Sequence, residues 1–300
     1  MNRSLMVALS FVSGTAAVAG QSVFRSGTSQ VTVSASVRQG NNVVAGLKAE
    51  DFVLTDNGVP QRVEALAVEP IPLDVTLFLD TSGSTSGRLD EMKKDVQGIA
   101  NLLRPDDRFR LLVIGDSVVE AVSWVAAGTK LSLPFEPVGG ISLVQDALLM
   151  AMLHRVEPAR RHLVVGMTDS HDCGSVVTSA ALNELAARSE AVVHIVDQSG
   201  SAGEASYRVR TCSPRARQDG PELIESAVNK TGGEVHRSHW FFRSASILGN
   251  FKKIFEDFRS SYVLRYSPEG VAATGWHGIT VTVPKKNKAT VRARAGYYGS

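Results

Sequence analysis

Residues 73–79 are rich in Leu, Val and Phe and lead directly into Asp80. A short apolar run of this kind is typical of a strand that is buried on both faces of a sheet. Ser82 and Ser84 follow, and Gly83 between them permits a turn that brings the three side chains toward one point. Carboxylate and hydroxyl oxygens suit Mg²⁺, Mn²⁺ or Ca²⁺ better than zinc. The segment therefore predicts a hard divalent cation at the rim of a sheet.

Strands alternate with helices through the middle of the chain. Such alternation predicts an α/β fold with a doubly wound, mostly parallel sheet of Rossmann type, covered by helices on both faces. Ligands of these sheets bind outside the carboxyl ends of the strands, which is where Asp80 falls. We expect strands at 73–79, 109–114, 118–125, 162–167, 191–196 and 262–266, and helices at 88–104, 142–154, 180–187, 224–228 and 247–258.

Two regions with the period-two pattern of β-strands flank this block, at 23–68 and 276–298. Neither has enough strands to bury an apolar face alone. We expect them to pair as a small β-sandwich, with the α/β domain inserted between them. The predicted division is 20–71 for the N-terminal β segment, 72–261 for the α/β domain and 262–300 for the C-terminal β segment.

Residues 1–19 predict a secretory signal peptide, because a short apolar stretch ends in the small residues Ala17 and Ala19. No other segment is long and apolar enough to span a bilayer, so we expect a secreted or periplasmic protein without an integral membrane segment. The two cysteines, Cys173 and Cys212, are expected to form a disulfide in such an oxidising compartment. Two unpaired thiols in loops are the alternative.

The overall composition indicates a folded core and gives no reason to expect nucleic-acid binding. The hydrophobic content of 43% is ample for a folded core. The 32 Lys and Arg residues against 30 Asp and Glu residues give a formal charge of +2, which offers no electrostatic case for nucleic-acid binding.

Two further oxygen ligands stand where this fold would place them. Ser142 follows a Gly-Gly-Ile loop that leads into a predicted helix, and Asp169 follows the predicted strand at 162–167. Asp80, Ser82, Ser84, Ser142 and Asp169 would then come from three loops on one rim. Because Mg²⁺ binds octahedrally and keeps several waters, such a site would leave a position for an outside carboxylate.

These residues resemble the metal-ion-dependent adhesion site (MIDAS) of von Willebrand factor type A (VWA) domains, in the Asp-x-Ser-x-Ser motif at Asp80, in Ser142 ahead of Asp146-Ala147, and in Thr168-Asp169. The flanking segments 46–52, 56–61, 262–266 and 291–297 are similar to bacterial secreted VWFA-related proteins. The resemblance implies a VWA fold and metal-dependent protein binding or adhesion, in which an Asp or Glu of a protein partner completes the Mg²⁺ shell. Ser82, Ser84 and Ser142 would coordinate by hydroxyl, and Asp80 and Asp169 largely through water.

Enzymatic alternatives find less support in the residues. A phosphotransferase of the haloacid dehalogenase type needs a second Asp where Ser82 stands, and the Gly-Asp-Ser triplet at 115–117 fits a tight turn better than an esterase motif. A metal-dependent hydrolase would use the segment 169–173 with His194, but no known catalytic motif supports it. We therefore expect a non-enzymatic protein. A structural scaffold, with metal used only for rigidity, is the second class of hypothesis; an acidic residue from 197–204 folded over the rim would favour it.

Overall fold

The computed structural model describes residues 30–40, 42–67, 71–81, 89–133, 141–154, 157, 159–168, 172–197, 221–237 and 247–299. The predicted signal peptide lies outside this described part. None of the helices in the described part has the length and apolar character that crossing a membrane requires.

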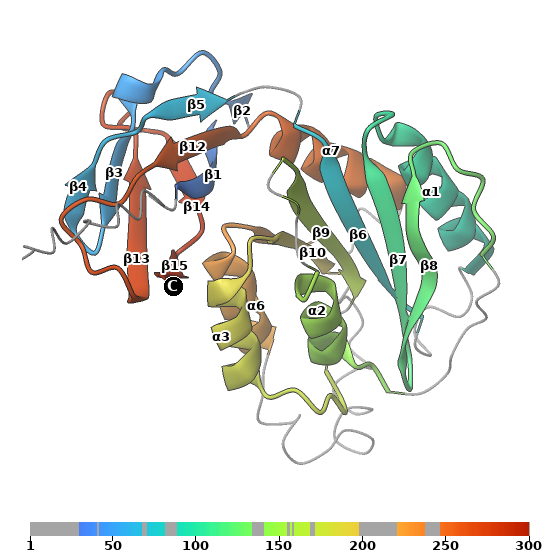
Figure 1. Ribbon diagram of the computed structural model, residues 1–300. Helices are drawn as coiled ribbons and strands as arrows, with labels where there is room; N and C mark the ends of the chain where they lie inside the picture. Colours follow the sequence, from blue (N-terminus) through green and yellow to red (C-terminus); the bar gives the residue numbers. More distant parts are fainter. Residues whose placement is uncertain are drawn as a thin grey trace, which may run out of the picture.

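A six-stranded sheet with the order β11-β10-β9-β6-β7-β8 forms the centre of the α/β domain (Figure 1). Neighbouring strands are parallel, except that the edge strand β8 runs antiparallel to β7. This confirms the predicted doubly wound, mostly parallel sheet. The strands are β6 (Leu73–Asp80), β7 (Arg108–Ile114), β8 (Val118–Ala126), β9 (Arg161–Thr168), β10 (Val192–Asp197) and β11 (Glu234–Arg237).

Helices cover both faces of this sheet (Figure 1). One face packs against α1 (Leu89–Leu102) and α7 (Ile247–Arg259), whose apolar residues join one buried cluster with alternate residues of the strands. The other face packs against α2 (Val144–Met152), α3 (Ser179–Arg188) and α6 (Pro221–Lys230) in a second cluster. Every residue of β6 and β9 is buried, as the apolar composition of these strands predicts.

The two central strands approach closely at one glycine. Phe78 of β6 pairs in register with Gly166 of β9. A Cβ atom at position 166 would lie 1.9 Å from Cζ of the Phe78 ring, so the ring can lie over the neighbouring strand only because residue 166 has no side chain.

The predicted β-sandwich is also confirmed. One sheet has the order β14-β1-β12-β5, with β2 beside β1, and the other has the order β15-β13-β3-β4. Both sheets combine strands from the two ends of the chain, and their facing apolar residues form a third buried cluster. The elements are β1 (Val31–Gln39), β2 (Asn42–Val43), a 3₁₀ turn (Ala49–Asp51), β3 (Val53–Asp56), β4 (Val59–Gln61), β5 (Ala65–Ala67), β12 (Tyr262–Tyr266), β13 (Gly275–Thr282), β14 (Thr290–Ala293) and β15 (Gly296–Gly299).

Several expected element boundaries were wrong. The helix expected at 142–154 begins only at Val144, because the carbonyl of Ser142 accepts the backbone amide of Cys173 at 2.9 Å instead of starting the helix. Within the expected β region at 276–298, β14 ends at Ala293, and the chain then forms β15, which pairs with β13 in the other sheet of the sandwich.

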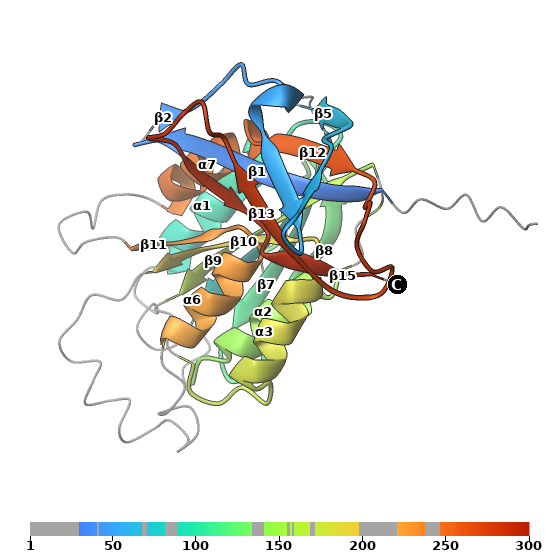
Figure 2. The same cartoon turned by 90° about the vertical axis from the view of Figure 1, so that its left-hand side faces the viewer.

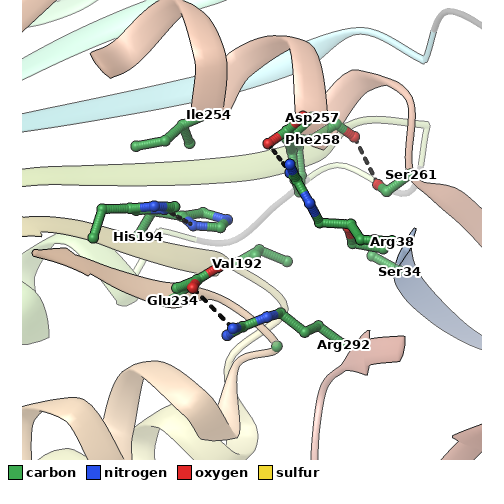
Figure 3. A pocket seen from close by; sticks show the side chains of 13 residues that line it. Ser34, Arg38, Val192, His194, Glu234, Ile254, Asp257, Phe258, Ser261 and Arg292 are labelled. Carbon is green, nitrogen blue, oxygen red and sulfur yellow. Dashed lines mark hydrogen bonds and ion pairs between the residues drawn. The ribbon is translucent and has the colours of Figure 1, made fainter. Parts of the chain in front are cut away.

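The sandwich contacts β10, β11 and α7 of the α/β domain (Figure 2) around a cavity of about 30 Å³. Figure 3 shows charged side chains from both domains that meet there. Arg292 of β14 pairs with Glu234 of β11 at 2.8 Å, and Arg38 of β1 pairs with Asp257 of α7. These ion pairs join the two domains directly, so we refer to this contact as the domain joint.

The joint also contains a pair of histidines. Nδ1 of His194 lies 3.0 Å from Nε2 of His236, and their rings are stacked. One ring must donate and the other accept, so the two cannot both carry a second proton in this arrangement. Burial lowers the pKa of both side chains, that of His194 to about 3.

A buried cluster of ion pairs holds the start of β6, around Asp74. The carboxylate of Asp74 accepts two hydrogen bonds from Arg108, at 2.8 and 2.7 Å, and one from Arg160 at 2.6 Å. It also lies 2.9 Å from Nε2 of His154, just beyond α2. Burial alone would raise the pKa of Asp74, but these hydrogen bonds outweigh it and hold the pKa well below its ordinary value. The cluster ties β7 and α2 to the start of the central strand.

The buried histidines predict a loss of stability in mild acid. Burial lowers the pKa of His162 in β9 to about 3, as it does for His194, whereas the pKa in the unfolded chain is about 6.5. Their contribution is therefore fully present above pH 6.5 and is lost as the pH falls toward 3. We expect the free energy of unfolding, measured by urea denaturation, to fall between about pH 6.5 and about pH 4.5 by up to about 1.4 kcal/mol per pH unit for each histidine.

The variant His162→Gln provides the control. Its side chain can still hydrogen-bond to the hydroxyl of Thr76, which lies 2.9 Å from Nε2 of His162, but it does not titrate. Its stability should depend less steeply on pH than that of the wild type over the same range. An equal slope in the two proteins would contradict the assignment.

Candidate functional site

Asp80 is the last residue of β6 and is 1% exposed. Its Oδ1 accepts a hydrogen bond from the Ser142 hydroxyl at 3.2 Å, and its Oδ2 accepts one from the Thr168 hydroxyl at 2.8 Å. Ser142 stands ahead of α2 and Thr168 ends β9, so three segments meet at the carboxyl edge of the sheet. A buried carboxylate needs such donors, because desolvation without hydrogen bonds is costly.

The structure brings together Asp80 and Ser142 of the predicted ligand set. Ser82, Ser84 and Asp169 lie outside the described residues. Thr168, which immediately precedes Asp169, has its hydroxyl at the Asp80 carboxylate. The sequence placed Thr168 beside a predicted ligand but did not reveal it as a donor to Asp80.

Thr81 fixes the direction in which the chain leaves β6. Its backbone amide and its hydroxyl both donate to the carbonyl of Ile114 at the end of β7, each at 2.9 Å. The side chain is fully buried. The predicted ligand turn after Asp80 therefore starts from a point that is anchored to the neighbouring strand.

Hydrogen bonds to side chains of two other loops also hold the segment that carries Ser142. The amide of Ile141 donates to the carboxylate of Asp116 at 3.0 Å, and the amide of Gln145 donates to that of Asp172 at 2.9 Å. Asp116 belongs to the Gly-Asp-Ser triplet, which forms the bend between β7 and β8 as expected. From the sequence, Asp172 entered only the hydrolase alternative, as part of the segment 169–173, and its hydrogen bonds to the Ser142 segment were not predicted.

The donor atoms fit a hard cation. Asp80, Ser142 and Thr168 present only oxygen atoms, which Mg²⁺, Mn²⁺ and Ca²⁺ prefer. Among the described residues, no group of three or more His, Cys, Asp or Glu side chains could hold a metal ion. A cation at this edge would therefore need the hydroxyl oxygens and Asp169 in addition to Asp80.

The remaining predicted residues lie as follows. The imidazole of His194 is hydrogen-bonded to His236 at the domain joint. This contact already engages the histidine that the hydrolase hypothesis would use. Cys173 is 8% exposed and packs against Ile141, and no cysteine among the described residues is a free thiol. Cys212 lies outside the described part of the chain, so its pairing with Cys173 stays a prediction.

The sequence resemblance implies this arrangement: an aspartate at a strand end, held by hydroxyls from two other segments at the carboxyl edge of a six-stranded, mostly parallel sheet. The α/β domain is VWA-like. No family model matches the sequence, and no curated protein does.

Several solved structures resemble this chain. The SpRpn10 VWA domain is 18% identical with a TM-score of 0.38, and the match covers 60% of this chain and 93% of that chain. An aerotolerance-related membrane protein from Bacteroides fragilis is 13% identical with a TM-score of 0.41, covering 62% and 98%. Proximal thread matrix protein 1 from the mussel byssus, with a zinc-occupied MIDAS motif, is 14% identical with a TM-score of 0.40, covering 68% and 49%. At these identities and TM-scores, the likenesses say nothing about what this chain binds.

The contact between Thr168 and Asp80 can be tested through stability. Thr168→Val removes the hydroxyl and leaves a buried carboxylate without one donor. We expect the free energy of unfolding in EDTA, measured with urea, to fall by about 1–3 kcal/mol. A double-mutant cycle with Asp80→Asn should show that the two side chains are coupled.

Thr129→Val is the matched control, because the Thr129 hydroxyl donates to the carbonyl of Ala126 at an exposed position. It should change the stability by less than about 0.5 kcal/mol. Equal effects of the two substitutions would contradict a special role for the Thr168 hydroxyl.

Proposed function

We propose that this chain is a secreted or periplasmic, non-enzymatic VWA-domain protein that binds a divalent cation at the carboxyl edge of its central sheet. The preferred ion is Mg²⁺, with Mn²⁺ or Ca²⁺ as substitutes. Through the ion, the protein binds an Asp or Glu carboxylate of a protein partner. Within the proposed division of the chain, residues 72–261 carry the site, and the β segments on either side support it.

The observation that supports this proposal best is the position of the Asp80 carboxylate. It is buried at the strand end and touches the hydroxyls of Ser142 and Thr168, which arrive from two other segments. Those hydroxyls orient the carboxylate without supplying positive charge. A cation beside it would gain the attraction of a preorganised negative group.

The proposed ligands divide into two kinds. Ser82, Ser84 and Ser142 would hold the ion through their hydroxyls, and Asp80 and Asp169 would contribute charge largely through water. The ion, when bound, supplies a positive centre with an exchangeable position. A partner carboxylate is the natural occupant of that position, because hard cations prefer anionic oxygen.

The scaffold alternative has one observation in its favour. Asp197 ends β10 in register with Thr168 of β9, and its side chain is 8% exposed. An acidic residue thus stands at the same edge of the sheet, and the scaffold hypothesis requires such a residue to fold over the rim. Residues 198–204 lie outside the described part of the chain.

Cation binding by the purified chain is the first test. We expect isothermal titration calorimetry with Mg²⁺ and Mn²⁺ to show one site, and Asp80→Ala to abolish it. Asp106→Ala serves as the control, because Asp106 is an exposed aspartate near the start of β7, at the opposite edge of the same sheet. Titration curves that are unchanged by Asp80→Ala would contradict the site.

Partner binding needs a separate experiment. Wild type and Asp80→Ala are used as bait for extracytoplasmic proteins, each with Mg²⁺ and with EDTA. Metal-bridged binding predicts capture only by the wild type with Mg²⁺. Equal capture under all four conditions would contradict it, and unfolding of the wild type in EDTA would favour the scaffold instead.

A further inference from the structure

The helix that follows Ser142 is capped by a different loop. Leu143 stands at the N-cap position of α2 and provides no side-chain hydrogen bond, although the first amides of a helix need acceptors. The carboxylate of Asp172 accepts the amide of Gln145 at 2.9 Å, and the hydroxyl of Ser175 accepts the amide of Asp146 at 3.1 Å. The loop 172–177 therefore does what an N-cap residue would normally do.

The helix holds this loop in return. The carboxylate of Asp146, in the first turn of α2, accepts the amides of Val176 and Val177 at 3.0 and 2.9 Å. Within the loop, Asp172 also accepts the amide of Ser175 at 3.1 Å as well as its hydroxyl. Asp172 is 2% exposed, so its hydrogen bonds are shielded from competition by water. We call these two carboxylates and their partners the brace.

The brace continues beyond the helix to the proposed ligand. The amide of Cys173, next to Asp172, donates to the carbonyl of Ser142 at 2.9 Å. On the other side of Ser142, the amide of Ile141 donates to Asp116 at 3.0 Å. The main chain of Ser142 is thus fixed from both sides while its hydroxyl points to Asp80. Capping α2 alone would not require these two contacts.

We propose that Asp146 and Asp172 are positioning residues that hold the Ser142 hydroxyl at Asp80 and so set the affinity of the site for its cation. This inference rests on the proposed function. Its physical basis is preorganisation: a ligand that is already ordered loses less conformational entropy when the ion binds. Groups that orient ligands of a metal typically change its affinity by about 10–100-fold when they are removed.

The test measures Mn²⁺ affinity of the full chain by electron paramagnetic resonance, below the melting temperature of every variant. We expect Asp172→Ala to weaken binding by about tenfold or more. Asp172→Asn should weaken binding less than Asp172→Ala, because its amide oxygen can still accept the amide of Gln145, although its NH2 group cannot accept the amide of Ser175. Thr178→Ala is the matched control: Thr178 caps α3 by accepting the amide of Ala181 at 3.1 Å, and it makes none of the brace hydrogen bonds.

Each other result overturns the proposal. If Asp172→Ala binds Mn²⁺ like the wild type, the brace does not set affinity. If Asp172→Asn is as weak as Asp172→Ala, the hydrogen bond to the amide of Gln145 does not set the affinity. If Thr178→Ala is equally weak, the effect is a general loss of helix stability.

Hydrogen exchange separates this inference from the proposed function. In Asp172→Ala, the amides of Cys173, Gln145 and Asp146 should lose protection in EDTA, where no cation is bound. Unchanged protection would refute the brace whatever the metal affinity. A wild type that binds no Mn²⁺ would refute the proposed function and, with it, the role of the brace in affinity, while the exchange data would still report whether the brace exists.

Discussion

The burial of the Asp80 carboxylate is the constraint on which the rest of the site depends. An aspartate that is 1% exposed at the end of a fully buried strand needs hydrogen-bond donors, and two of them come from distant parts of the sequence. Ser142 and Thr168 supply them from 62 and 88 residues away. A parallel sheet solves this problem, because its carboxyl strand ends and the loops that follow them lie along one edge.

The central strand carries a second buried carboxylate at its other end, and the described donors of the two carboxylates differ. Asp74 is held by the guanidinium groups of Arg108 and Arg160, which oppose its negative charge. The donors described for Asp80 are neutral hydroxyls. The first arrangement ties elements together at the start of the strand. The second keeps a carboxylate ordered in a state that a cation would favour, as the proposed function requires.

The β-sandwich and the α/β domain contact each other directly and are not connected only through the chain. Ion pairs cross the joint, and the turn before β11 comes so close to the sandwich that a Cβ on Gly232, which has φ of +85°, would lie 2.7 Å from the main chain of Ala293. Figure 1 shows β6 starting on the side of the sandwich and running away from it. The sandwich therefore supports the end of the sheet where β6 starts. The edge that carries Asp80 lies at the other end of the sheet.

The sequence by itself determined which segments are buried and which residue types end the strands. The apolar runs of β6 and β9, the alternation in β1 and β13, and the place of Asp80 at the end of a buried strand all follow from local composition and periodicity, since these reflect burial directly. Only the tertiary structure decided that Thr168 donates to Asp80, that Asp116, Asp146 and Asp172 hold the Ser142 segment, and that α2 starts two residues late. These depend on hydrogen bonds between residues far apart in the chain, whose partners are set by strand order and loop path. A periodic sequence pattern indicates on which face of a strand or helix a residue lies. It does not indicate which loop will contact that residue in the folded protein.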